Sequence, residues 1–131
     1  MYLLDTNVLS DIVRRPRGKI GKRILQVGTN SVATNVIVAG ELRFGALKNV
    51  RPGLAARIEE VLGLVSILPL NENASRAYGE IRVELERLGT PISANDLWIA
   101  AHARAEGLTL VTANEREFAR VTGLRIENWL A

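Results

Sequence analysis

Segments with strand and helix patterns alternate along the whole chain, and this alternation constrains the fold more than any other feature. Short apolar runs bounded by turn residues predict strands, whereas apolar residues three and four positions apart predict helices. The clearest helix covers residues 71–88, where Ala77, Ile81 and Leu85 share one face and Gly89 stands where a helix commonly ends.

The complete pattern contains five short strands and seven helices. The strands are expected at residues 2–4, 31–34, 65–68, 108–111 and 124–126, and the helices at 6–14, 19–27, 36–48, 54–62, 71–88, 95–106 and 116–119. Such alternation predicts an α/β fold in which helices flank both faces of a central, mostly parallel sheet. The 131 residues contain no linker or repeat, so we expect a single domain, 1–131.

The composition excludes several kinds of catalysis. The chain has no cysteine, which rules out disulfides, thiolate nucleophiles and cysteine-based zinc sites. The single histidine, His102, cannot support a two-histidine ribonuclease mechanism, and we expect it at the surface or at an interface. Neither a Walker loop nor a dinucleotide-binding glycine motif is present.

The sequence favours a cytoplasmic protein. Its first residues lack the basic region of a secretory signal. The longest uncharged run, 24–40, contains too many polar residues for a membrane span. We therefore expect no association with a membrane.

Three acidic residues stand out because no basic residue lies three or four positions from them. They are Asp5, directly after the first expected strand, Glu41, within an apolar helix, and Asp96, near the start of another helix. An acid in an apolar setting must be protonated, be paired across the fold, or bind a metal. Ligands of parallel α/β sheets bind beyond the carboxyl ends of the strands, where these acids could converge. Together they predict a site for a hard divalent cation.

Each acid also has a structural interpretation. Asp5 could cap the helix that follows it, and Asp96 could form a capping box with Ser93. Glu41 could form a buried ion pair with a distant arginine. Capping and metal binding are compatible, because a carboxylate at the start of a helix can do both.

The basic residues are a weaker indication of nucleic acid. The net charge is +3, and 14 of the 17 basic residues are arginines, which bind phosphate in a bidentate manner. A basic stretch begins at the end of the first helix and contains Arg14, Arg15, Arg17, Lys19, Lys22 and Arg23. It could follow an RNA backbone, with the first four residues as the RNA-binding candidates, or simply be a solvated loop.

The two tryptophans carry little functional information. We expect Trp98 and Trp129 in the core or at an interface. Trp98 lies two positions from Asp96, so stacking on an RNA base is an alternative.

Four segments resemble a known family when they are read in order. They are LDTNVLS at 4–10, ELRFGA at 41–46, NDLWIAAHA at 95–103 and LVTANEREF at 110–118. Together they resemble the PIN domain and, more narrowly, the VapC-like ribonuclease toxins of bacterial type II toxin-antitoxin modules. The resemblance extends from residue 3 to Trp129, which is nearly the whole chain.

The resemblance implies an active site and a cofactor. Asp5, Glu41 and Asp96 match the acids that bind Mg²⁺ or Mn²⁺ in PIN domains. Thr6 and Thr112 match small hydroxyl residues near the metal, and Glu117 matches the family's last acid. Many members carry an aspartate where this chain has Asn114, so we expect Asn114 to orient a neighbour and Glu117 to act in the outer shell or at a second metal.

The resemblance also implies an activity and partners. We expect hydrolysis of RNA phosphodiester bonds by a metal-activated water, with a homodimer and a small VapB-like antitoxin that blocks the site. A non-catalytic RNA- or protein-binding module is the alternative. A receiver domain or a phosphatase of the Asp-x-Asp type fits less well, because the last lysine is Lys48 and position 7 is an asparagine.

Overall fold

A computed structural model describes all 131 residues. The strands are β1 (Tyr2–Leu4), β2 (Val32–Asn35), β3 (Ser66–Leu68), β4 (Thr109–Val111) and β5 (Ile126–Glu127). The helices are α1 (Thr6–Arg14), α2 (Lys19–Val27), α3 (Val36–Lys48), α4 (Leu54–Leu62), α5 (Glu72–Arg87), α6 (Ala94–Ala105) and α7 (Glu115–Phe118), with a short 3-10 turn at Thr29–Ser31. Every predicted strand and helix is present, with its ends shifted by two residues at most.

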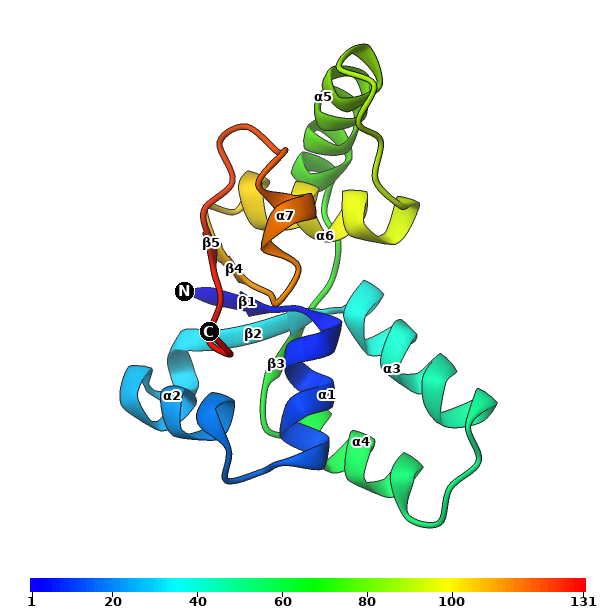
Figure 1. The fold of residues 1–131 in the computed structure, drawn as a ribbon, viewed down its shortest axis with the longest axis vertical. Helices are drawn as coiled ribbons and strands as arrows, with labels where there is room; N and C mark the ends of the chain where they lie inside the picture. The colour runs from blue at the N-terminus through cyan, green and yellow to red at the C-terminus, as the bar shows by residue number, and fades with distance from the viewer.

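The strands form one parallel sheet in the order β3-β2-β1-β4-β5, as the alternation predicted. In Figure 1, α1, α2 and α4 lie below β1 and β2, and α5, α6 and α7 lie above them. β1 and β2 run from left to right in this view, and α1 and α3 begin where these strands end. The expected sheet with helices on both faces is therefore confirmed.

The order of the strands places a switch point beside β1. The chain adds β2 and β3 on one side of β1, and later adds β4 and β5 on the other. Leu4 pairs with Val111, and the backbone N–H of Asp5 donates to the carbonyl oxygen of Val111 at 2.9 Å. Ligands of such sheets bind beyond the carboxyl ends of the strands at a switch point, so Asp5 and the residue after β4 mark the expected position.

Small and branched residues make the core between sheet and helices. Leu3 and Leu110 are fully buried in the sheet. Ala100, Ala101 and Ala103 are also fully buried, so α6 can lie close to the strands because its side chains are short.

Helices α5 and α6 pack against each other and are joined by residues 88–93. Gly89 adopts φ +70°, and the N–H of Thr90 donates to the carbonyl oxygen of Leu85 at 2.9 Å, which is the predicted glycine C-cap. Tyr78 of α5 stacks on Trp98 of α6 with 4.1 Å between ring centroids. None of the helices, including the 16-residue α5, is long and apolar enough to cross a membrane.

Candidate active site

Asp5 is held by hydrogen bonds at both carboxylate oxygens. It caps α1, since Oδ1 accepts from the backbone N–H of Thr6 at 2.8 Å. Oδ2 accepts from the Oγ1 hydroxyl of Thr112, the residue after β4, at 2.7 Å. Asp5 is only 4% exposed and forms no ion pair. Two neighbouring parallel strands therefore fix one buried carboxylate at the switch point.

Glu41 is joined to Asp5 through Thr6. Glu41 lies in α3, and its Oε1 accepts from the Oγ1 hydroxyl of Thr6 at 2.7 Å. Thr6 thus donates its backbone N–H to one acid and its hydroxyl to the other. The alternative of a buried ion pair at Glu41 is wrong, because no arginine or lysine forms an ion pair with it.

Asp96 reaches the site from the first turn of α6. Ser93 caps this helix, and its Oγ accepts from the backbone N–H of Asp96 at 3.3 Å. This bond is one half of the capping box considered for Ser93 and Asp96. Asp96 forms no ion pair and lines the pocket described below.

Burial and the charges of neighbouring acids raise the pKa values of Asp5 and Asp96. Burial raises the pKa of Asp5, hydrogen bonds from Thr112 and Thr6 lower it, and the charges of Glu41 and Glu117 raise it further. Burial, followed by the charges of Glu117 and Asp5, raises the pKa of Asp96 to about 6. Both shifts disfavour the ionised acids, and a nearby cation would oppose them.

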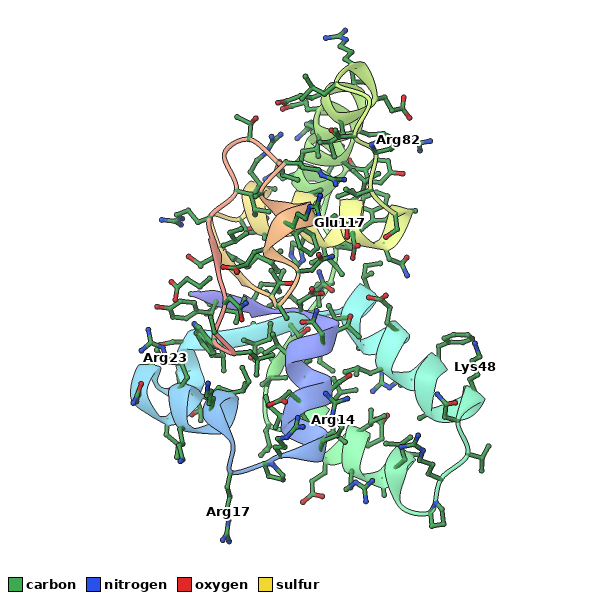
Figure 2. All side chains as sticks on the ribbon, in the orientation of Figure 1. Arg14, Arg17, Arg23, Lys48, Arg82 and Glu117 are labelled. Carbon is green, nitrogen blue, oxygen red and sulfur yellow. The ribbon has the colours of Figure 1, made fainter.

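Asn114 and Glu117 form a pair at the edge of the site. The Nδ2 of Asn114 donates to Oε2 of Glu117, and the backbone N–H of Asn114 donates to the hydroxyl of Thr112 at 3.0 Å. Figure 2 shows Glu117 on α7, close to α6. Asn114 therefore holds Glu117 beside the site, while the charge of Glu117 acts on Asp5 and Asp96.

One open pocket of about 350 Å³ collects these residues. It is lined by polar side chains alone: Asp5, Thr6, Asn7, Ser10, Arg14, Glu41, Asp96 and Asn114. Asn7 and Ser10 were missed in the sequence. The spacing of Thr6, Ser10 and Arg14, four residues apart on one helix face, could have revealed Ser10.

The donor chemistry of this pocket fits a hard divalent cation. Three carboxylates line it without an ion-pair partner, and oxygen ligands are those that Mg²⁺ and Mn²⁺ prefer. No three acids lie close enough to form a closed ligand cluster as the side chains stand. The predicted acids thus line a common pocket, but their carboxylates do not yet surround a single metal position.

The basic stretch separates into residues with different surroundings. Arg14 lines the acidic pocket, whereas Arg15 forms an ion pair at 2.7 Å with Asp11, one helical turn earlier. Figure 2 shows Arg17 pointing away from the molecule, and Lys19 is exposed at the start of α2. Of the four predicted RNA-binding residues, the structure brings only Arg14 to the acids.

His102 corrects one expectation. It was expected at the surface or at an interface, but it is 1% exposed within the chain. Its Nδ1 lies 3.0 Å from Nδ2 of Asn35, the residue that caps α3. A buried polar partner far away in the sequence explains why a histidine is tolerated in the core.

The two tryptophans pack against other aromatic residues. Trp129 is buried, with its ring centroid 5.0 Å from that of Tyr2, as expected of a core residue. Trp98 is half-buried against Tyr78 and does not line the acidic pocket.

Comparisons with known proteins give the family. The model of the PIN domain matches residues 2–124. Ribonuclease VapC2 of Haemophilus influenzae is 41% identical over 130 residues, which cover 98% of each chain. The tRNA(fMet)-specific endonuclease VapC of Salmonella typhimurium is 36% identical over 129 residues, which cover 98% of this chain and 97% of the relative.

A solved structure agrees with these sequence matches. VapBC2 from Rickettsia felis, bound to a DNA fragment from its promoter, contains a chain with a TM-score of 0.92 and 34% identity, covering 98% of each chain. Sequence and fold agree, and the chain belongs to the PIN-domain family, among its VapC members.

Proposed function

We propose that the protein is a metal-dependent endoribonuclease and the toxin of a type II toxin-antitoxin module. The observation that carries the proposal is the convergence of Asp5, Glu41 and Asp96 on one polar pocket at the switch point of the sheet. Relatives named ribonuclease and tRNA(fMet)-specific endonuclease support the choice of RNA as substrate.

The three acids would hold Mg²⁺ or Mn²⁺ in this proposal. The bound cation would lower the pKa of a water and stabilise negative charge on the phosphate. Thr112 and Thr6 would orient Asp5 and Glu41 through the hydroxyl bonds at 2.7 Å. Asn114 would hold Glu117 in an outer position, where its carboxylate can accept a proton or bind a second cation.

The proposal includes partners and a location. VapB and VapC of Rickettsia felis occur together in a solved complex, so we propose a small VapB-like antitoxin that covers the acidic pocket. We further propose a homodimer that acts in the cytoplasm on structured RNA such as tRNA.

Cleavage of total cellular RNA by the purified, antitoxin-free protein tests the activity. We expect discrete fragments in Mn²⁺ or Mg²⁺, none after chelation, and none from the Asp96→Asn variant. Sequencing the fragment ends would identify the RNA. Absence of metal-dependent cleavage by the folded protein would contradict the proposal and favour a binding module without catalysis.

A further inference from the structure

A second hollow continues from the acidic pocket. It measures about 370 Å³ and is lined by residues of α1, α3 and α4, together with Asn49 and Arg51 of the α3–α4 loop. Thr6, Ser10, Arg14 and Glu41 line both spaces, so the two form one groove. Each part is large enough for a small ligand, for which pockets start at about 300 Å³. We call the second hollow the α1–α4 groove.

Two arginines face this groove without a partner. Arg14 lies in the last turn of α1 and Arg51 lies just before α4. Both are exposed, and neither forms an ion pair or a side-chain hydrogen bond. Six other arginines of the chain are paired with acids: Arg15, Arg23, Arg43, Arg76, Arg82 and Arg104. The free guanidinium donors of Arg14 and Arg51 are therefore available for an anion.

The remaining walls of the groove are mixed in character. Val13, Leu42, Leu54 and Ile58 provide apolar surface, while Ser10 and Asn49 provide hydrogen-bonding groups. A nucleotide needs both, since its base and sugar have apolar faces and its edges are polar. Figure 2 shows Arg14 between α1 and α4, on the side of the molecule away from Arg23.

We infer that the α1–α4 groove binds the RNA strand next to the bond that is cut. Arg14, at the junction with the acidic pocket, binds the phosphate nearest the acids, and Arg51 binds a phosphate farther along the strand. The inference rests on the proposed ribonuclease function and adds the direction in which the substrate leaves the site. The RNA phosphates would then bind along this groove and not along the basic stretch, because Arg15 forms an ion pair with Asp11 and Arg17 points away from the molecule.

Equilibrium binding measures the contribution of Arg14 and Arg51 to RNA affinity separately from catalysis. The Asp96→Asn protein, which is expected not to cut, is titrated into a short fluorescein-labelled oligoribonucleotide at several salt concentrations, and anisotropy gives Kd. We expect Arg14→Ala and Arg51→Ala each to raise Kd about tenfold and to reduce the slope of log K against log salt by about 1. The lysine variants at both positions keep the charge and should retain most of the slope.

Two further variants act as controls. Arg87→Ala removes one exposed charge at the end of α5, outside the groove, and should leave Kd nearly unchanged. Arg17→Ala distinguishes the groove from the basic stretch. Circular dichroism and thermal unfolding show whether every variant is folded.

The outcomes separate the two proposals. If Arg14→Ala and Arg51→Ala bind RNA like Arg87→Ala while the wild type still cuts in metal, the groove is not the RNA path and the ribonuclease stands. If Arg17→Ala weakens binding as much as Arg51→Ala does, RNA follows the basic stretch and the inference is overturned. If the wild type does not cut RNA at all, it is the proposed function that fails.

Discussion

The side chains of Asn35 and His102 meet in the core, with Nδ2 of the asparagine 3.0 Å from Nδ1 of the histidine. The Oδ1 of Asn35 already accepts from the backbone N–H of Val38 at 3.0 Å, so its amide nitrogen faces the imidazole as donor. His102 must then accept at Nδ1 and carry its proton on Nε2. The bond joins α3, which carries Glu41, to α6, which carries Asp96. Glu41 lies six residues after Asn35, and Asp96 lies six residues before His102. Six residues correspond to about 9 Å along a helix.

Loss of the Asn35 side chain should destabilise the protein more than loss of an ordinary helix cap. Asn35→Ala removes the cap of α3, worth about 0.5–2 kcal/mol, and leaves the buried Nδ1 unsatisfied, at about 1–3 kcal/mol. Asn35→Ser can keep the cap and should lose only the stability that comes from the hydrogen bond to His102. Urea unfolding measures the free energy of unfolding of both variants. Asn71→Ala, at the exposed cap of α5, is the matched control, and an equal loss at both sites would contradict the role of His102.

Acid should weaken the fold through His102. Burial lowers the pKa of His102 below 6.5, partly offset by the charge of Glu106, so the unfolded chain binds a proton more readily than the folded one. The stability that neutral His102 provides is therefore present above about pH 6.5 and declines as the pH falls below it. We expect the stability difference between wild type and His102→Gln to shrink from about pH 7 to about pH 5. A constant difference would show that His102 has an unshifted pKa.

Metal affinity should depend on pH through Asp96. Its pKa of about 6 means that a proton competes with the cation below that pH. We expect the affinity for Mn²⁺, measured by calorimetry, to fall by about tenfold per pH unit below about pH 6 as one proton is displaced. The Asp96→Asn protein should bind Mn²⁺ weakly and with a flatter pH profile. Unchanged tight binding by that variant would remove Asp96 from the ligand set.

The raised pKa of Asp96, caused by burial and then by neighbouring charges, also predicts that the Asp96→Asn variant is more stable than the wild type without metal. A raised folded pKa means that the ionised Asp96 opposes folding above about pH 6. In the presence of a chelator near pH 7, Asp96→Asn should therefore unfold at a higher temperature than the wild type. Addition of Mn²⁺ should reverse the order, because only the wild type gains stability from tight binding. Thermal unfolding with and without Mn²⁺ makes this comparison, and a wild type that is the more stable protein in chelator would contradict it.

The hydroxyl of Thr6 can be removed with little change of shape. Thr6→Val keeps the backbone N–H that binds Asp5 but deletes the donor to Glu41. Loss of such an outer-shell partner typically lowers metal affinity or activity by about 10–100-fold. Thr6→Ser retains a hydroxyl and should stay close to the wild type. Cleavage rates at saturating Mn²⁺ and calorimetric affinity distinguish an effect on Glu41 from a loss of folding, and equal rates for valine and serine would show that the bond is dispensable.

The pattern of the sequence was sufficient to predict the sheet and its helices because each element has a local signal. Residues 71–88 have the apolar spacing of a helix, and Gly89, which adopts φ +70°, marks its end. The three acids were also visible locally, since none had a cation at helical spacing. Their hydrogen bonds to Thr6 and Thr112 were not predicted from spacing, because one of them joins residues 107 positions apart.

Residues whose environment depends on distant partners were harder to predict. His102 lies in an alanine-rich helix that is buried on most sides, and its partner Asn35 is 67 positions earlier. The basic stretch looks like one continuous surface in the sequence, although the spacing of four residues between Asp11 and Arg15 already indicates that these two can pair. Arg51 gave no signal, because only the packing of α1 against α3 and α4 places it in the groove.

The place of β4 in the sheet has a consequence for the growing chain on the ribosome. A nascent chain that ends before residue 109 already contains Asp5, Glu41 and Asp96, but it lacks both the strand that pairs with β1 and the hydroxyl of Thr112 that holds Asp5. Domains fold as units once their chain has emerged. The acids therefore reach their final arrangement only after β4 and Thr112 have been synthesised, and a fragment that ends before them would not carry the assembled site.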